Sequence, residues 1–229
     1  MSINANTDLF TKKLSLACEA MHIDLSKTQQ IRLLAYLEHL QKWNKTYNLT
    51  AIRDPEQALT HPLFDSLSVV TPLREYCAQR AITQPKILDV GSGGGLPGIV
   101  IAIVMTDAVV TCVDAVEKKI AFIRNAAGVL KLKKLNAQHA RVEVLAAEDA
   151  DIVISRAFAS LKDFADIAGK HVEAQGVLVA MKGKIPTQEI QDLVHQQRWD
   201  VTKTQILDVP ELDAERCLIW MKRMQSEYR

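Results

Sequence analysis

The sequence has few cysteines, and the four that it has form no recognisable motif. Cys18, Cys77, Cys112 and Cys217 are widely separated among 229 residues, with no C-x-x-C pair and no histidine at ligand spacing. This spacing argues against a zinc site and against a disulfide framework. We therefore expect buried free thiols of a reducing compartment, and no metal centre.

The chain also lacks an excess of charge and a long apolar run. Its 28 Lys and Arg residues nearly balance 27 Asp and Glu residues, for a formal net charge of +1. Any nucleic-acid binding must therefore rely on local basic patches. The longest apolar run lies just after Pro97, and no stretch is typical of a signal peptide or a membrane span. These absences predict a cytoplasmic protein with no membrane partner.

Glycine is scarce as well, and its distribution is uneven. Five of the nine glycines lie between residues 91 and 98, directly after the apolar run Lys86–Val90. A short apolar run before a turn is typical of a buried strand, and glycines let the turn approach a ligand closely. The apolar residues after Pro97 predict a helix. Together these features predict the first unit of a nucleotide-type α/β fold.

Two ligands compete for this glycine turn. Gly93, Gly95 and Gly98 match the dinucleotide spacing G-x-G-x-x-G. Asp89 followed by alternate glycines matches acid-x-G-x-G-x-G, as in S-adenosylmethionine-dependent methyltransferases. A dinucleotide needs helix N–H groups directed at its pyrophosphate, and Pro97 removes one such donor. A tight structural turn without a ligand is the third interpretation.

From residue 86 onward, predicted strands and helices alternate, which is typical of a parallel sheet covered on both faces. The strands are predicted at Lys86–Val90, Val109–Val113, Leu135–Ala140, Asp151–Ile154 and Val177–Met181, with antiparallel edge strands at Trp199–Ile206 and Arg216–Lys222. The helices between them are predicted at Gly98–Met105, Val116–Leu130, through Leu161 to Ile167, and from Pro186 to about Gln197. A chain of this length suits one α/β domain with an extension.

The first 75 residues are predicted to form a helical extension, followed by the main domain over residues 76–229. Its helices are predicted at Asn6–Met21, from the N-cap Ser26 through Trp43, and from His61 to about Val70. The loop Trp43–Thr50, continuing through Ala51–Pro55, combines polar and aromatic residues. Trp43 and Tyr47 could pack at a helix end. Alternatively, Asn44, Lys45, Tyr47 and Asn48 line the mouth of the cofactor site.

Candidate site residues follow the predicted strands at their carboxyl ends, where open α/β sheets bind ligands. Asp114 ends the second strand, where a carboxylate is placed to accept hydrogen bonds from ribose hydroxyls. Val142 and Glu143 fall where the third strand would meet the adenine edge of a cofactor. Arg156 follows the fourth strand. With Gly91, Gly93, Gly95 and Leu96 from the turn, these residues form the predicted cofactor site.

With these residues in hand, the chain resembles the small-subunit ribosomal RNA methyltransferase G family, also called glucose-inhibited division protein B. The matching blocks are Trp43–Lys45 through Asn48–Thr50, His61 through Asp65–Ser66, Asp89–Gly98, and Ile154–Ala157. One departure is Gly94, where the family pattern leads us to expect alanine or proline. The resemblance implies a class I, Rossmann-like methyltransferase sheet. It also implies methylation of guanosine N7 in 16S ribosomal RNA, at position 527 of the family's rRNA numbering, with S-adenosylmethionine as donor.

This reaction is consistent with the absence of an evident catalytic base. Guanine N7 has an exposed lone pair, so no proton must leave before it attacks a methyl group. The rate should come from in-line placement of the reactants. We assign Arg156 to binding, of a phosphate or of the donor's carboxylate, because a cation would oppose the positive charge that develops on the base. The other interpretations are an NAD-dependent oxidoreductase and an RNA-binding module with a degenerate cofactor site.

The implied partner is 16S ribosomal RNA, as free RNA, a small subunit or an assembly intermediate. Local cations are candidate RNA contacts: Lys118, Lys119, Arg124, Lys131, Lys133 and Lys134 in the second crossover, and Lys182 and Lys184 beside the site. Specific RNA recognition often stacks a single-stranded base on an aromatic ring, which Phe158 or Tyr47 could supply. A solvated face is the alternative for each lysine.

Overall fold

The computed structural model describes residues 2–49, 59–156 and 158–224. Its strands are β1 (Lys86–Val90), β2 (Val109–Asp114), β3 (Leu135–His139), β4 (Ala150–Ser155), β5 (Val172–Lys182), β6 (Trp199–Leu207) and β7 (Arg216–Arg223). Within the described residues they form one seven-stranded sheet in the order β3-β2-β1-β4-β5-β7-β6. Strands β1 to β5 are parallel, whereas β7 is antiparallel to both β5 and β6. This confirms the predicted α/β sheet with an antiparallel edge.

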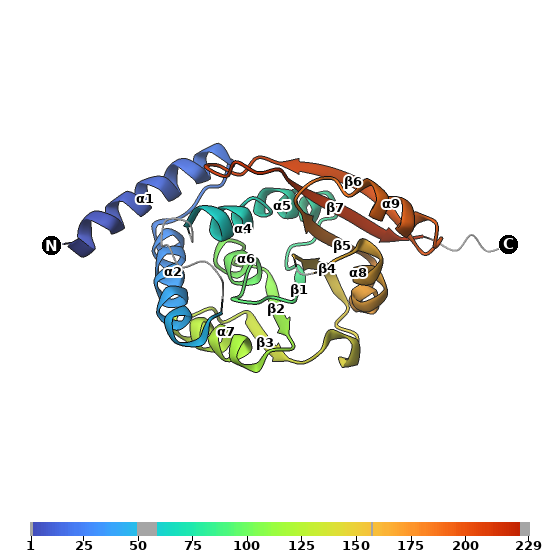
Figure 1. Cartoon of the computed structure of the whole chain (residues 1–229), viewed down its shortest axis with the longest axis horizontal. Helices are drawn as coiled ribbons and strands as arrows, with labels where there is room; N and C mark the ends of the chain where they lie inside the picture. Colours follow the sequence, from blue (N-terminus) through green and yellow to red (C-terminus); the bar gives the residue numbers. More distant parts are fainter. Residues whose placement is uncertain (1, 50–58, 157, 225–229) are drawn as a thin grey trace.

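Helices cover both faces of this sheet (Figure 1). The described helices are α1 (Ser2–Ala20), α2 (Lys27–Tyr47), α4 (Asp65–Leu67), α5 (Val70–Gln79), α6 (Gly98–Val104), α7 (Glu117–Val129), α8 (Leu161–Ala168) and α9 (Thr187–Val194). The segment η1 (Leu59–Phe64) is a π-helix, and η2 (Val142–Val144) and η3 (Gly169–His171) are single 3-10 turns. Apolar side chains of α1, α2 and α5 to α7 share one core with one face of the sheet, and those of α8 and α9 pack on the other.

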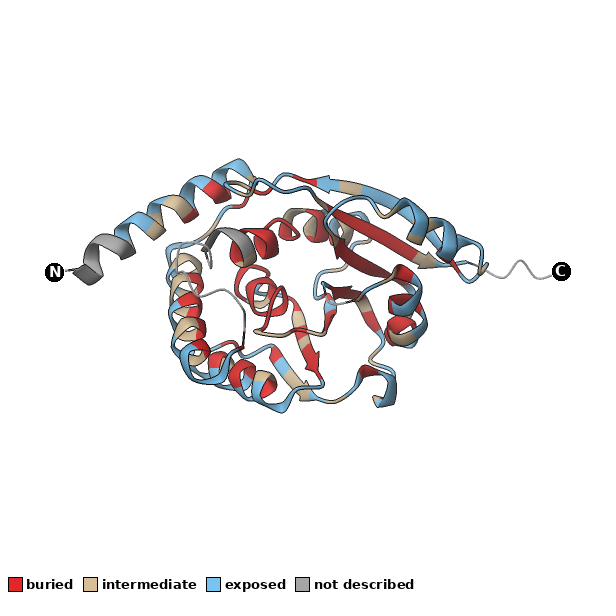
Figure 2. Cartoon of the chain, viewed as in Figure 1, coloured by how far each residue is buried: buried red, intermediate tan, exposed pale blue. Residues whose placement is uncertain are grey.

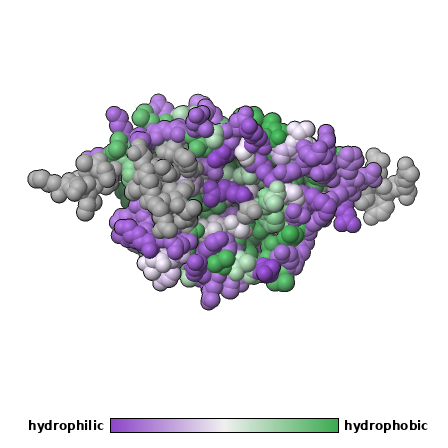
Figure 3. All heavy atoms as spheres, in the orientation of Figure 1, coloured by the Kyte–Doolittle hydropathy of each residue, from purple (hydrophilic) through white to green (hydrophobic). Residues whose placement is uncertain are grey.

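Burial follows the position of each strand in the sheet. The central strand β4 is buried on both faces, as expected for a parallel strand covered by helices on each side. Strand β7 is also buried along most of its length, whereas the edge strand β6 is largely exposed (Figure 2). On the face turned toward the viewer in Figure 3, hydrophilic residues predominate and apolar residues gather in separate groups.

The N-terminal helices differ from the prediction in three places. Helix α1 begins at Ser2, before the predicted start at Asn6. The single helix predicted from His61 to about Val70 is instead the π-helix η1 followed by α4, and α5 then continues to Gln79. Helix α2 continues to Tyr47, so five residues of the predicted loop at Trp43–Thr50 are helical. The helix ends at Asn48, which adopts a left-handed conformation and donates its backbone N–H to the carbonyl of Asn44. Asparagine tolerates this conformation well and often follows a helix. Thr50 and the predicted loop at Ala51–Pro55 lie outside the described residues.

Strand β5 is longer than predicted. It begins at Val172, five residues before the predicted start, and a register shift against β4 between Ala150 and Ile152 accommodates the early part of the pairing. Helix α9 ends at Val194, slightly before the predicted end near Gln197. The other predicted strands and helices of residues 86–223 are confirmed to within a few residues.

The topology brings several strand ends to one edge of the sheet. The carboxyl ends of β1, β2, β4 and β5 meet there, and β7 begins there because it runs antiparallel to β5. The hydroxyl of Ser155, the last residue of β4, donates to the carbonyl of Val90 at the end of β1, at 2.7 Å. This bond ties the central strand ends together just before the glycine turn.

Candidate functional site

The glycine turn between β1 and α6 has the backbone conformation that its sequence predicts. Gly91, Gly93 and Gly95 all have positive φ angles. The N–H of Gly91 donates to the carbonyl of Val113 in β2, at 2.8 Å. At Gly93, φ is +57°, and a Cβ built there has no heavy atom within 4 Å. Gly93 therefore has both a conformation that disfavours side chains and open space where a side chain would go.

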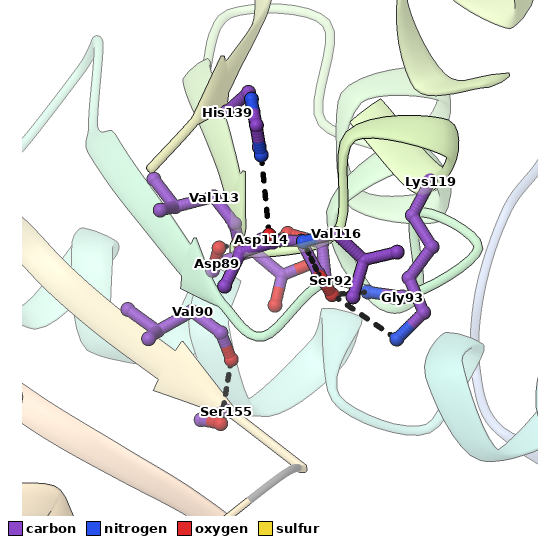
Figure 4. A network of polar contacts seen from close by, with 11 residues as sticks. Asp89, Val90, Ser92, Gly93, Val113, Asp114, Val116, Lys119, His139 and Ser155 are labelled. Carbon is purple, nitrogen blue, oxygen red and sulfur yellow. Dashed lines mark hydrogen bonds and ion pairs between the residues drawn. The ribbon is translucent and has the colours of Figure 1, made fainter. Parts of the chain in front are cut away.

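Asp114, at the end of β2, holds this turn in place (Figure 4). Its carboxylate accepts the N–H of Gly93 and the N–H of Val116, each at 2.9 Å. Lys119 lies 3.5 Å from the same carboxylate, and the Asp114 side chain is only 8% exposed. A carboxylate has about four lone-pair sites, so acceptor capacity remains for a ligand hydroxyl. Asp114 thus has the geometry expected of a ribose-binding acid, and it also shapes the turn.

Asp89 lies beneath the turn at the start of α6. Its carboxylate accepts the N–H of Gly98 at 2.8 Å, and a Cβ at Gly98 would lie only 2.7 Å from the same oxygen. Burial raises the pKa of Asp89 to about 6, although the Gly98 N–H and the Arg156 charge oppose this shift. The N–H that begins the helix is therefore already occupied by a carboxylate. A dinucleotide pyrophosphate needs such helix N–H donors, so this contact disfavours the dinucleotide interpretation.

Helix α2 braces the turn and α6 from the side. The hydroxyl of Tyr36 donates to the carbonyl of Gly94 at 2.6 Å. The side-chain amide of Gln29 donates to the carbonyls of Ile103 and Val104, at the end of α6. A Cβ at residue 94 would lie 3.1 Å from Cδ1 of Leu40, also in α2, so the unexpected glycine there allows close helix packing. None of these contacts was evident from the sequence.

A cavity of about 410 Å³ opens beside the glycine turn. It is lined by Asp65, Gly91, Ser92, Gly93, Arg156, Met181, Lys182, Gly183 and Arg216. Three of the predicted cofactor residues, Gly91, Gly93 and Arg156, therefore meet around one space. Asp114 joins them through its hydrogen bond to Gly93.

The other predicted site residues are not among the described residues that line this cavity. Gly95 and Leu96 are buried in the turn. Val142 is buried and Glu143 is exposed in η2, which follows β3 beside the end of β2. Lys170 donates to the carbonyl of Glu143 at 2.6 Å, and His171 lies 2.9 Å from the carbonyl of Val142. The η2 turn is thus held by two side chains of η3.

Asp65 and Arg216 were not predicted as site residues. Asp65 is a buried residue of α4 that contacts both Arg156 and Arg216. Asp65 falls in one of the sequence blocks that carry the family resemblance, but its role there depends on long-range contacts. For Arg216 a signal did exist, because an antiparallel edge strand must begin at the carboxyl edge of its parallel neighbour.

Several residues proposed to contact RNA have intramolecular partners. Lys182 forms an ion pair with Glu189 at 2.8 Å and donates to the carbonyls of Phe158 and Ala159. Arg124 donates to a backbone carbonyl of β3, and Lys134 to that of Asp107. Phe158 stacks on Phe164 with ring centroids 5.0 Å apart. Lys118, Lys131, Lys133 and Lys184 are exposed.

The end of α2 does not contribute to the described lining of the cavity. Asn44 is buried, whereas Lys45, Tyr47 and Asn48 are exposed. Trp43 packs against Phe122 of α7, with ring centroids 5.6 Å apart, and Tyr47 lies against Trp43. The packing interpretation of Trp43 is therefore confirmed.

Among the described residues, no group of three or more His, Cys, Asp or Glu side chains is arranged to hold a metal ion. The described part of the chain also contains no helix long and apolar enough to cross a bilayer. The four cysteines are free and buried, as expected, and burial raises the thiol pKa of Cys18 to about 12 and of Cys77 to about 11.

The fold is shared with a solved S-adenosylmethionine-dependent methyltransferase from Aquifex aeolicus. The two structures superpose with a TM-score of 0.52 over 73% of this chain and 98% of the other, at 15% sequence identity. A solved ribosomal protein L11 methylase from Lactobacillus delbrueckii subsp. bulgaricus is similar, with a TM-score of 0.52 over 68% of this chain and 79% of that one, at 14% identity. This likeness confirms the predicted Rossmann-like methyltransferase fold.

Sequence comparison gives more specific information than the shared fold does. The family model described as "GidB: rRNA small subunit methyltransferase G" matches residues 29–219. The chain is 56% identical to the Ribosomal RNA small subunit methyltransferase G of Bordetella avium (strain 197N), over 94% of each chain. The family model matches most of α2 and the sheet as far as the middle of β7. The chain belongs to the rRNA small subunit methyltransferase G family.

Proposed function

We propose that this chain is an S-adenosylmethionine-dependent methyltransferase that methylates N7 of a guanosine in 16S ribosomal RNA. Family membership carries the proposal, because the match includes most of α2, which braces the turn, and all described residues that line the cavity. The occupied N–H at the start of α6 argues independently against the NAD-dependent alternative. A degenerate cofactor site is disfavoured because the glycine turn and both acids are intact.

The described residues fit S-adenosylmethionine. The open space at Gly93 is a cradle that a Cβ would fill, and Asp114 retains acceptor capacity beside it. We assign Asp114 to the ribose hydroxyls, Val142 and Glu143 to the adenine, and the turn from Gly91 to Leu96 to the remainder of the cofactor. Arg156 is assigned to binding of a carboxylate or a phosphate at the next strand end.

The cofactor supplies an activated methyl group when bound, and the chain's own task is to position the acceptor. Asp65 is the one carboxylate among the described residues that line the cavity, and guanidinium groups occupy both of its oxygens. Both oxygens are therefore engaged in ion pairs. Guanine N7 requires no base from this cavity, because its lone pair needs no deprotonation. Catalysis then rests on holding N7 in line with the methyl group, about 3 Å away.

The proposed partner is the small-subunit RNA, met as free RNA, a subunit or an assembly intermediate. We propose that the exposed lysines at positions 118, 131 and 133, near α7, contribute to RNA affinity, since they have charge available for phosphates. Tyr47, 45% exposed, is the more exposed of the two candidate stacking residues. We also propose a cytoplasmic location, and a division into an extension over residues 1–75 and a methyltransferase domain over 76–229.

A methyl-transfer assay tests this function directly. The purified chain is incubated with methyl-labelled S-adenosylmethionine and either protein-free 16S RNA or small subunits from cells that lack the protein. Modified guanosines are located by borohydride–aniline cleavage, which detects N7-methylguanosine. We expect one labelled site, and the two substrates separately report whether RNA or the assembled subunit is recognised.

Label on another base, or on another atom of guanine, would refute the proposed reaction. Calorimetric titration with S-adenosylmethionine and with NAD provides the control for the cofactor. Binding of NAD in place of S-adenosylmethionine would restore the oxidoreductase interpretation.

A further inference from the structure

One buried carboxylate joins two arginines from distant parts of the chain. Asp65, only 6% exposed, accepts Nε of Arg216 on one oxygen at 3.0 Å and Nη1 of Arg156 on the other at 3.3 Å. The Arg156 and Arg216 side chains are 32% and 27% exposed, and both line the cavity. The carboxylate thus holds two guanidinium groups side by side with part of each facing the open space.

The charges around this cavity do not cancel. Lys182 is offset by its ion pair with Glu189. Among the described residues that line the cavity, Asp65 is the one carboxylate beside the two arginines, so one positive charge of the lining remains. Each guanidinium has five N–H donors, and the described contacts to Asp65 and to the carbonyl of Glu215 occupy few of them. A partly buried pair of guanidinium groups with free donors is suited to an anion such as a phosphate.

The sheet order indicates which anion reaches Arg216. The proposed ribose and adenine contacts lie at β2 and after β3, on one side of β1, whereas Arg216 begins β7 on the other side. Neighbouring strands are about 4.8 Å apart, so four strand spacings put Arg216 roughly 19 Å from Asp114 across the sheet. Arg156, directly beside β1, is within reach of either ligand. Arg216 therefore lies on the side of β1 away from the proposed cofactor contacts, where space remains for the acceptor.

We propose that Arg216, oriented by Asp65, binds a backbone phosphate of the RNA that presents the target guanosine. This assignment rests on the proposed function. Arg216 is then a substrate-binding residue, and Asp65 is a positioning residue that acts through it. The contact would fix the RNA backbone beside the cavity, so that the base can enter toward the glycine turn.

Arg216→Ala and Arg216→Lys test the contact, and Arg80→Ala is the matched control. Arg80 follows α5 ahead of β1, at the opposite edge of the sheet, and its removal changes the net charge equally. We expect Arg216→Ala to raise the KM for RNA about tenfold, with kcat at saturating RNA and the Kd for S-adenosylmethionine unchanged. The slope of log Kd for RNA against log salt should fall by roughly 0.7, the value for one phosphate contact.

Arg216→Lys should restore part of the RNA affinity, because lysine keeps the charge but loses the fork of donors. Asp65→Asn should raise the KM for RNA without removing any cation, which a purely electrostatic role of Arg216 does not predict. Thermal melting of each variant establishes that it is folded. If Arg216→Ala or Asp65→Asn is unfolded, the test is made with Arg216→Lys.

The outcomes separate this proposal from the proposed function. If the wild-type chain methylates RNA but Arg216→Ala binds RNA as tightly as Arg80→Ala, the phosphate contact is refuted and the function stands. A raised Kd for S-adenosylmethionine in Arg216→Ala would assign the arginine to the donor's carboxylate and also refute it. If the wild-type chain transfers no methyl group to RNA, both proposals fail.

Discussion

Replacing Gly93 with alanine separates the stability of the turn from its ligand binding. Alanine keeps the backbone N–H that donates to Asp114. It must adopt the left-handed conformation of residue 93, φ +57°, which costs roughly 1–2 kcal/mol for an L-residue. No atom lies within 4 Å of the new methyl group, so no steric cost within the protein is added. For a chain of this size the melting temperature should fall by roughly 2–8 °C.

The effect on S-adenosylmethionine should be larger than the effect on folding. The new methyl group of Gly93→Ala enters the space assigned to the cofactor, and overpacking of that kind costs roughly 1–3 kcal/mol. We therefore expect the Kd from calorimetric titration to rise about 5- to 150-fold. Gly93→Val should weaken binding further, because a branched side chain fills more of this space and is strained at positive φ.

Gly128→Ala is the matched control for this substitution. Gly128 lies in α7 and also has no heavy atom within 4 Å of its built Cβ, but it has a helical backbone. Alanine should stabilise the helix there by roughly 0.5–1 kcal/mol and leave cofactor binding unchanged. A folded Gly93→Ala variant that binds S-adenosylmethionine like the wild type would refute the assignment of this space to the cofactor.

Three further substitutions test the residues around the turn. Asp114→Asn should raise the Kd for S-adenosylmethionine about 10- to 100-fold in calorimetry, because an uncharged amide would replace the carboxylate that accepts two backbone N–H groups. The control Asp107→Asn, just before the start of β2, should leave this Kd unchanged. Burial raises the pKa of Asp89 from 3.8 to about 6, so the cost of ionising this carboxyl in the folded chain builds up between these two pH values and is absent below them. As the pH falls from 7 to 5, the free energy of unfolding of the wild type should therefore rise by roughly 1 kcal/mol relative to that of Asp89→Asn, measured in denaturant melts. A constant difference between the two would contradict the raised pKa. Tyr36→Phe should cost about 1–3 kcal/mol of stability, since it leaves the Gly94 carbonyl without its donor, and an unchanged melting temperature would show that this bond is dispensable.

The parts of the site that sequence could predict are those set by local pattern. The strand–turn–helix unit at residues 86–104 follows from a short apolar run, closely spaced glycines and a proline. Asp114 follows from its place at the end of the second apolar strand. The alternation of elements then predicts a parallel sheet, and a parallel sheet brings its carboxyl ends to one edge.

The parts that sequence could not predict depend on contacts between distant residues. Asp65 and Arg216 are separated by 151 positions and meet only through the final sheet order. Lys182 was interpreted as an RNA contact, but its exit from β5 places it against Glu189 of α9. The extended end of α2 depends on a single left-handed residue, Asn48, which no periodic pattern reveals.

The helical extension contributes to the site although the described lining of the cavity includes little of it. Helix α2 contacts the glycine turn through Tyr36 and the last carbonyls of α6 through Gln29. Asp65, in α4, holds the two arginines that line the same cavity. The turn and the arginines are therefore positioned by elements that precede the sheet in sequence. In this chain the residues before the first strand act as the rigid support that a site at a sheet edge requires.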